Sequence, residues 1–239
     1  MRVWDLNVGY LSQSSLLGQH AEIHSLFSVL MGGKKGYSSH PETLRWRGHL
    51  GELLWRHDLT VREMVLRGLQ HRSPLGVVGD LELKGPGPGF VDPPLEQFRL
   101  LEEKYQGTGK SGRIPLPLEA RDFWLHHHRS VRVRNPDRCK DLGEALKEGN
   151  LEGKEPLISE VLEILSTAPH SGEMRREIRS IQNEIEGSAS PEEAEELLAG
   201  PDWPPTELLK HIYRLALKYE KVDIVNSTLL ADRWHPYLA

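Results

Sequence analysis

Residues 14–31 read SSLLGQHAEIHSLFSVLM, and this stretch decides how the first part of the chain folds. Its large apolar side chains recur at intervals of three and four residues, which is the spacing of one face of an α-helix. Ser14 or Ser15 is suited to cap the N-terminus of this helix, and Gly32-Gly33 is suited to end it. The pattern therefore predicts an amphipathic helix over residues 14–31.

The polar side of this predicted helix carries a possible reactive group. Four polar residues recur at three- and four-residue spacing, so we expect them to share one face. They are Ser15, Gln19, Glu22 and Ser25. Because a single carboxylate lies there among small polar neighbours, the face has room for a substrate, and Glu22 is a candidate catalytic residue.

The remaining sequence also predicts helices. Pro41 is well placed to begin a second helix that runs to Gly68, although Gly48 and Gly51 weaken or bend it. Glycine and proline punctuate the connection after Gly68, which predicts a long irregular loop. Further helices are expected at residues 93–105, 119–134, 156–167, 172–187, 190–199 and 204–220. The predicted fold class is all-α, with long irregular loops in the first domain and a small helical bundle at the C-terminus.

Charge divides the chain into two parts. Residues 1–150 carry 21 basic and 18 acidic side chains, whereas residues 151–239 carry 9 and 17. A surface that binds phosphates is therefore expected in the N-terminal part. Residues 141–155 are polar and glycine-interrupted, which predicts a linker between a domain at 1–145 and an acidic helical domain at 156–239. The leucine-rich stripe of the second domain indicates a small bundle, whose expected role is protein contact or oligomerisation.

Composition limits the class of protein. The 239 residues are 38% hydrophobic and 27% charged, which permits one large or two modest domains. No apolar run approaches the ~20 residues of a membrane span, so we expect a cytoplasmic protein without a membrane partner. The single cysteine, Cys139, excludes an internal disulfide framework and a cysteine-only metal site.

The start of the chain offers a second reactive group. A bulky residue such as Arg2 should block removal of the initiator methionine, which leaves a free α-amine on Met1. An α-amine titrates near pH ~7.7–8.0, so a useful fraction is neutral and can attack an aldehyde-like carbon while Glu22 handles the protons. The alternative is that Met1 is an ordinary N-terminus and Glu22 a solvated helix residue.

Residues 16–27, LLGQHAEIHSLF, resemble the first helix of the pyrimidine-dimer DNA glycosylase/AP lyases first described from a bacteriophage, and the likeness runs without a gap back to Met1. Residues 56–68, RHDLTVREMVLRG, preceded by Gly48-His49, resemble the second long helix of that family. Ile114-Pro115 and residues 126–136 resemble its C-terminal helix more loosely. The resemblance covers about residues 1–140 and leaves the C-terminal helical domain as an addition.

The resemblance implies a DNA repair glycosylase with AP lyase activity, acting on pyrimidine-dimer-like or modified bases in duplex DNA. It implies a Schiff base between the Met1 amine and the sugar, with Glu22 as the catalytic glutamate. No metal or organic cofactor is implied, because the protonated imine is itself the electron sink. The implied partner is damaged double-stranded DNA at the nucleoid. Ala21 and Ser25 stand where the family has arginines beside and after its glutamate, so the substrate contacts differ.

Several side chains are candidate DNA contacts. The candidates are Arg2, Gln19, His20, Arg45, Arg47, His49, Arg56, His127, Arg129 and Arg132. The arginines at 45, 47 and 56 alternate with tryptophans, which indicates either a phosphate-contacting face or arginine stems that cover a buried aromatic side. The basic residues at 127–132 form either a phosphate-binding edge or a solvated helix surface.

Twelve histidines are many for this length, and they raise a metal hypothesis. His20 and His24 lie at i and i+4 and could bind one ion, with His49 or His57 completing the site. A satisfied core histidine is the alternative identity of His57. The expected metal content is none, because Glu22 lies at the wrong angle to share that face and no H-E-x-x-H motif is present. Two rival functions remain, a metal-dependent hydrolase or nuclease that uses these histidines and a non-enzymatic helical DNA-binding module.

Overall fold

The computed structural model describes residues 2–32, 37–76, 87–151, 153–198 and 205–232. These ranges contain eleven α-helices and two short 3-10 helices and no β-strand, which confirms the all-α prediction. Contacts divide the chain into two compact units, Met1–Gly112 (unit 1) and Arg113–Ala239 (unit 2). Among the described residues, no helix is both long and apolar enough to span a membrane.

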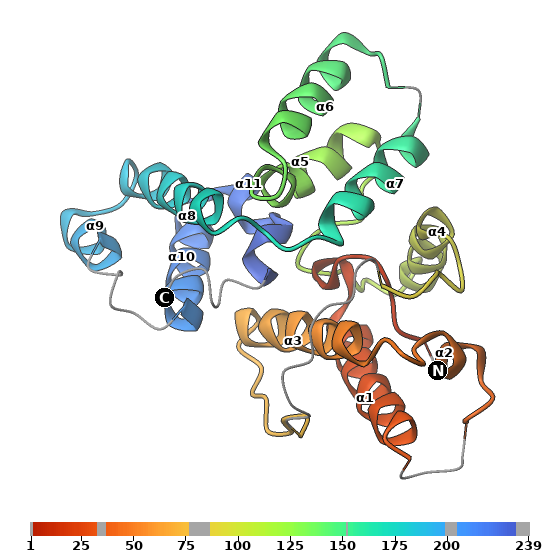
Figure 1. Cartoon of the computed structure of the whole chain (residues 1–239). Helices are drawn as coiled ribbons and strands as arrows, with labels where there is room; N and C mark the ends of the chain where they lie inside the picture. The colour runs from red at the N-terminus through yellow and green to blue at the C-terminus, as the bar shows by residue number, and fades with distance from the viewer. Residues whose placement is uncertain (1, 33–36, 77–86, 152, 199–204, 233–239) are drawn as a thin grey trace. The chain divides into compact units, whose positions relative to one another are not determined.

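Unit 1 is built on helix α1, Gln13–Leu30, which packs along α3, Leu50–Leu66 (Figure 1). The cap of α1 is Ser12, whose hydroxyl accepts the N–H of Ser15 at 3.3 Å. The prediction of Ser14 or Ser15 as the cap was therefore wrong by two or three residues. The helix ends where predicted, because Gly32 has a φ of +83°, a conformation that favours glycine.

The second predicted helix is broken into two. Helix α2, Pro41–Arg45, ends after little more than one turn, and α3 begins only at Leu50. Gly48, with a φ of +80°, makes the break in the left-handed region that other residues adopt only with strain. Helix α4, Pro94–Tyr105, and the short 3-10 helix η1, Val8–Tyr10, complete the described elements of unit 1.

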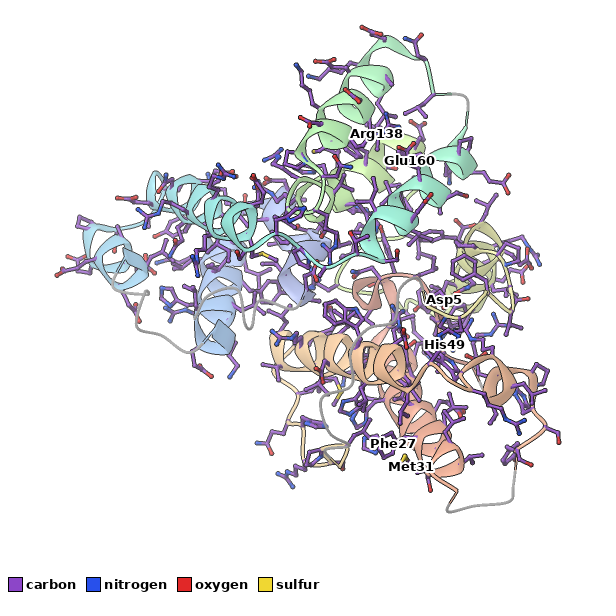
Figure 2. The ribbon with its side chains drawn as sticks, in the orientation of Figure 1. Asp5, Phe27, Met31, His49, Arg138 and Glu160 are labelled. Carbon is purple, nitrogen blue, oxygen red and sulfur yellow. The ribbon has the colours of Figure 1, made fainter. Side chains whose placement is uncertain are left out.

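The apolar core of unit 1 joins α1, α3 and the N-terminal residues. Figure 2 places Phe27 and Met31 at the C-terminal end of α1 and His49 at the start of α3. Phe27 and Leu75 pack against this core from its edge, so the segment after α3 returns to α1. The buried members of the core cluster are Val3, Ile23, Leu26, Trp46 and Leu53.

Unit 2 begins earlier than the sequence predicted. Helix α5, Ala120–Arg132, packs against α6, Pro136–Glu148, and α7, Lys154–Leu165, so it belongs with the C-terminal helices and not with residues 1–112. The predicted linker at 141–155 was wrong over most of its length, because α6 occupies residues up to 148. The signals for α6 were present in the sequence: Asn135 caps the helix, proline follows it, and Gly149 ends the helix with a φ of +73°.

The remaining helices of unit 2 pack together, whereas the predicted bundle at 156–239 also included the residues of α7, which packs against α5. Helix α8, Ser171–Glu186, packs against α9, Pro191–Leu198, and α10, Pro205–Lys218. Two short elements follow, α11, Val222–Val225, and η3, Thr228–Ala231, and η3 contacts α5.

Unit 2 holds a buried ion-pair cluster centred on Arg129. The guanidinium of Arg129 lies 2.6 Å from Glu177, 2.8 Å from Glu184 and 2.9 Å from Asp223, and its side chain is only 4% exposed. Glu177 is equally buried and also pairs with Arg132 at 3.0 Å. Charges removed from water are stable only when they are paired, so α5, α8 and α11 are held together by complementary charge.

Replacing Arg129 with methionine should therefore destabilise unit 2. We expect Arg129→Met to lower the free energy of unfolding by about 3 kcal/mol, measured by urea unfolding followed by circular dichroism, because Glu177 would stay buried beside only one cation. The matched control is Arg138→Met. Arg138 of α6 and Glu160 of α7 point toward each other in Figure 2, with Nε 2.8 Å from Oε1, but their side chains are 45% and 32% exposed. That loss should stay under ~1 kcal/mol, and equal losses in the two variants would contradict the structural role of Arg129.

Candidate active site

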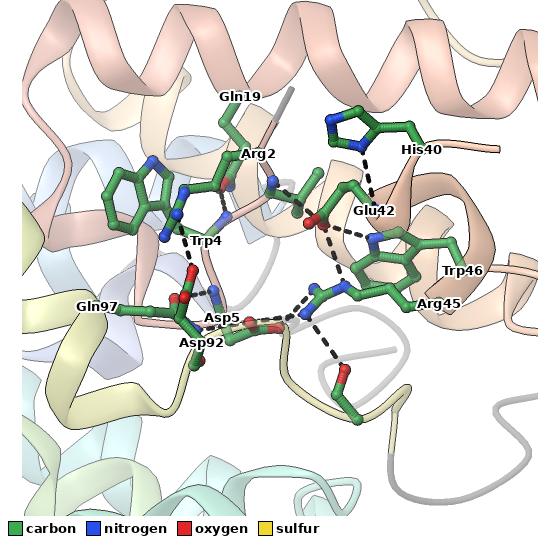
Figure 3. Close-up of polar contacts among 12 residues, drawn as sticks. Arg2, Trp4, Asp5, Gln19, His40, Glu42, Arg45, Trp46, Asp92 and Gln97 are labelled. Atoms are coloured by element: carbon green, nitrogen blue, oxygen red, sulfur yellow. Dashed lines mark hydrogen bonds and ion pairs between the residues drawn. The ribbon is translucent and has the colours of Figure 1, made fainter. Parts of the chain in front are cut away.

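The N-terminal residues are fixed against α1 and α2 by side-chain hydrogen bonds. The backbone N–H of Trp4 donates to Gln19 Oε1 at 2.9 Å, and the N–H of Val3 donates to Glu42 Oε1 at 3.3 Å (Figure 3). Val3 and Trp4 are buried, so these two N–H groups would be unsatisfied without these acceptors. Met1 lies outside the described residues.

Gln19 links three segments of unit 1. Its carbonyl oxygen accepts the Trp4 N–H, and its amide nitrogen donates to Thr60 Oγ1 of α3 at 3.0 Å. Gln19 and Ser15 are buried, so the prediction of one open polar face on α1 was wrong for these two residues. Glu22 is half-buried and Ser25 is exposed, which leaves the accessible part of that face at its C-terminal half.

The carboxylate of Glu42 anchors the other side of the N-terminal segment. Besides the Val3 N–H, Oε1 accepts the indole N–H of Trp46 at 3.0 Å and lies 3.1 Å from Nε of Arg45. The guanidinium of Arg45 also lies over the Trp46 ring, 4.8 Å from its centroid. Two hydrogen-bond donors and one ion pair thus stabilise a carboxylate that is only 3% exposed.

A second carboxylate, Asp5, continues the network. It accepts two hydrogen bonds from Arg45, at 2.8 and 3.0 Å, and one from the amide of Gln97 at 2.8 Å. Gln97 returns its own carbonyl oxygen to the N–H of Asp5 at 2.8 Å. The network ties α2 and α4 to residues 3–5, as Figure 3 shows.

A pocket of about 240 Å³ opens beside this network. Its lining includes the carboxylates of Asp5, Glu42 and Asp92 and the guanidinium groups of Arg2 and Arg45. Three negative groups against two positive ones suit a neutral or cationic group better than a phosphate. The volume lies below the ~300–1,000 Å³ typical of pockets for drug-sized ligands, so a single sugar or base is the appropriate size.

Four histidines gather on the other side of α1. His20 and His24 of α1, His57 of α3 and His71 of the following segment place one ring nitrogen each within 4.8 Å of one another. Burial, reinforced by the neighbouring imidazoles, lowers the pKa of His20 to about 4, and burial also lowers the pKa of His24. The sequence predicted that His20 and His24 could bind an ion together with His49 or His57. The structure brings His57 and also His71 to them, but not His49.

Comparison with known proteins identifies the first part of the chain. The sequence model of a family described as pyrimidine dimer DNA glycosylase matches residues 1–76. The first third of the chain is thus similar in sequence to the pyrimidine dimer DNA glycosylase family. No curated protein and no solved structure matches the chain. The match covers about a third of the 239 residues, so the looser likeness over residues 77–140 stays a prediction.

The glycosylase family acts on DNA. In unit 1, several of the predicted DNA contacts are instead bonded to other groups of the protein. Gln19 and Arg45 hold the N-terminal segment through their hydrogen bonds. For the alternating arginines and tryptophans, this favours the interpretation that arginine stems cover a buried aromatic side. Arg56 donates to the carbonyl oxygen of Leu6, and burial lowers its pKa to about 10. His20 belongs to the histidine cluster.

Three predicted contacts of the glycosylase-like unit remain accessible. Arg47 is exposed and donates to the carbonyl oxygen of Ser38 at 3.0 Å. Arg2 pairs with Asp92 at 2.7 Å while 38% of its side chain is exposed. The ring of His49, 35% exposed, has Nδ1 3.8 Å from the carboxylate of Glu52. Arg47, Arg2 and His49 are thus the predicted contacts of unit 1 that stay open to solvent.

The predicted phosphate-binding edge at 127–132 has a structural role in unit 2. His127 is buried and stacks on Phe123 with ring centroids 4.0 Å apart, and burial lowers its pKa to about 3. Arg129 is the centre of the buried ion-pair cluster. Arg132 is 43% exposed but pairs with Glu177. A neutral imidazole and two carboxylate-bound guanidinium groups are poorly suited to bind phosphate.

The anchor through Gln19 can be tested directly. Gln19→Ala removes the acceptor of the Trp4 N–H and the donor to Thr60, so we expect a loss of about 1–3 kcal/mol in unfolding free energy. Hydrogen exchange of the Trp4 amide should become faster by a factor of ~10 or more, because local opening no longer breaks a hydrogen bond. The control is Gln13→Ala, an exposed residue of the first turn of the same helix. Unchanged exchange at Trp4 would contradict the anchor.

Proposed function

We propose that this chain is a DNA glycosylase with AP lyase activity on pyrimidine-dimer-like or modified bases in duplex DNA. The α-amine of Met1 is the nucleophile and Glu22 is the proton-transfer group. One observation carries the proposal: the N-terminal segment is hydrogen-bonded to α1, the helix that carries Glu22. Both lie in the part of the chain that matches the glycosylase family. An amine positioned by the fold is what this chemistry requires.

Val3 and Trp4 contact the part of α1 that bears Glu22. Trp4 is bonded to Gln19, one helical turn before Glu22, and Val3 packs with Ile23, the residue after Glu22. The Met1 Cα is one peptide, or ~3.8 Å, from that of Arg2. The segment that follows Met1 is held to the same part of α1 as the half-buried Glu22, which supports a joint role of the Met1 amine and this carboxylate.

The proposed reaction begins on a nucleotide that has been flipped from the base stack. The lone pair of the neutral amine forms a bond to C1′, and the glycosidic bond breaks with its electron pair leaving on the base, which takes up a proton. Opening of the C1′–O4′ bond gives a protonated imine. Glu22 assists ring opening and supports removal of a proton from C2′, after which the C3′–O bond breaks by β-elimination.

The pocket beside Arg2 is proposed to receive the flipped base, because Glu22, which acts on the sugar, does not line it. Its size suits one such group, and its acidic lining disfavours the phosphates, which would stay at the rim near the accessible Arg2 and Arg47. The replacement of the family's arginines by Ala21 and Ser25 is consistent with substrate contacts supplied from this side of the unit.

Borohydride trapping tests the nucleophile. In the presence of abasic-site duplex DNA, borohydride should reduce the imine to a stable protein–DNA crosslink, and peptide mapping should locate the adduct on the Met1 amine. One or two extra residues before Met1 move the amine by up to ~3.5 Å per residue, beyond the ~0.5 Å tolerance of a positioned group, so the crosslink and the strand cleavage should be lost together.

The outcomes of trapping separate the rival functions. An adduct on a lysine would keep the lyase and reject Met1 as its nucleophile. No adduct on either abasic or dimer-containing DNA would reject the enzyme class and favour a DNA-binding module.

A second test concerns the carboxylate. Glu22→Gln keeps the size of the side chain and removes its charge and basicity, so binding to damaged duplex should persist while cleavage falls by a factor on the order of 10² or more. The control is Glu103→Gln, an exposed glutamate of α4 that pairs with Arg99. Near-native cleavage by Glu22→Gln would make Glu22 a surface residue without a catalytic role.

A further inference from the structure

The four histidines form a cluster that the glycosylase chemistry does not use. They come from three segments: His20 and His24 from adjacent turns of α1, His57 from the middle of α3, and His71 from the segment that follows α3. Leu75 holds that last segment in place, because it packs against the core between α1 and α3. The fold therefore assembles four imidazoles from residues that are up to 51 positions apart.

The spacing of the rings suits one metal ion. Nε2 of His20 lies 3.3 Å from Nε2 of His24. A zinc ion bound tetrahedrally at ~2.0–2.1 Å separates its nitrogen ligands by about 3.3 Å. The ring centroids of His57 lie 5.1 Å from those of His20 and His24 and 5.3 Å from that of His71. The widest pair of ring nitrogens is within 4.8 Å, so it has to close by about 1.5 Å at most to reach the same geometry.

Two of the ring nitrogens need a partner. Nε2 of His57 and Nε2 of His71 are buried and have no hydrogen-bond partner among the described residues. His57 is also only 4% exposed, so water does not readily replace the missing partner. A buried nitrogen without a partner is unfavourable, and a metal ion would satisfy both lone pairs at once.

The surroundings of the rings suit metal binding as well. A metal binds imidazole in its neutral form. The other nitrogen of a metal-bound histidine is usually oriented by a carboxylate or a backbone group. Here Asp58 Oδ1 lies 3.7 Å from Nδ1 of His57, and the backbone of Ser73 forms a hydrogen bond with His24.

We propose that His20, His24, His57 and His71 bind one divalent transition-metal ion, with zinc as the best match, in a structural site of unit 1. Four imidazole nitrogens are borderline-soft ligands that zinc accepts in tetrahedral geometry, and a closed set of four protein ligands is typical of structural sites. The ion cross-links α1, α3 and the segment after α3. It thereby fixes the helix that carries Glu22 from a face that lies ~160° around the helix from Glu22.

Metal content of the purified full-length chain tests this site. After removal of metal with a chelator, titration with zinc should restore one bound ion per chain, and Co²⁺ in its place should give the visible absorption of a tetrahedral nitrogen site. Saturating zinc should raise Tm by about 5–10 °C, because the ion binds only the folded state.

Two variants remove one ligand each, and a third is the control. His71→Ala and His24→Ala should each weaken zinc binding by at least ~100-fold, since even the partners of metal ligands contribute 10–100-fold to affinity. His49→Ala, in the same unit but outside the cluster, should bind zinc as the native chain does. A native chain that is folded and binds neither zinc nor Co²⁺ would overturn the proposal. So would equal zinc loss in His49→Ala and His71→Ala.

The site can be tested separately from the proposed glycosylase function. Metal content, Co²⁺ absorption and Tm require no DNA, and the Co²⁺ spectrum is read on the native chain even where a histidine variant does not fold. Loss of borohydride trapping with intact zinc binding would reject the nucleophile alone. Intact trapping without any metal binding would reject the zinc site alone.

Discussion

Unit 1 depends on one side-chain amide. Gln19 is the point at which the N-terminal segment, α1 and α3 meet, because its two ends satisfy a backbone N–H of Trp4 and the hydroxyl of Thr60 in a buried place. An amide can accept and donate at the same time, which a carboxylate or an aliphatic side chain cannot do. Residues 2–7 form no helix or strand, so their position is set by such side-chain acceptors.

Regular periodicity made most of the fold predictable from the sequence. The helices at 14–31, 93–105, 172–187 and 190–199 were placed within one or two residues, because apolar spacing and glycine or proline ends are local signals. Local signals failed where they competed. Gly48 divided the second helix, and the polar composition of 141–148 hid α6, although Asn135, Pro136 and Gly149 marked its ends.

The candidate site was predictable only in part, since exposure is decided by tertiary packing. Helical spacing grouped Ser15, Gln19, Glu22 and Ser25 on one face, but it could not show that a backbone segment covers the first two. The sequence also predicted that Arg129 contacts phosphate. In the structure its buried guanidinium pairs with three carboxylates from α8 and α11. His71 carried no local signal of its role, because its partners are brought to it by the return of the chain onto α1.

Helix α1 carries two separate sets of proposed functional groups, and its geometry keeps them apart. With ~100° between successive residues, Ile23 lies ~40° and Glu22 ~60° from Gln19, on either side of it. His20 and His24 lie ~160° from Glu22, so the carboxylate cannot join the imidazoles as a ligand. One face of the helix can therefore be held by a metal ion while Glu22 stays available on the side of the N-terminal segment. This separation makes a structural ion compatible with imine chemistry in the same unit, and it distinguishes the cluster from the active site of a metal-dependent hydrolase.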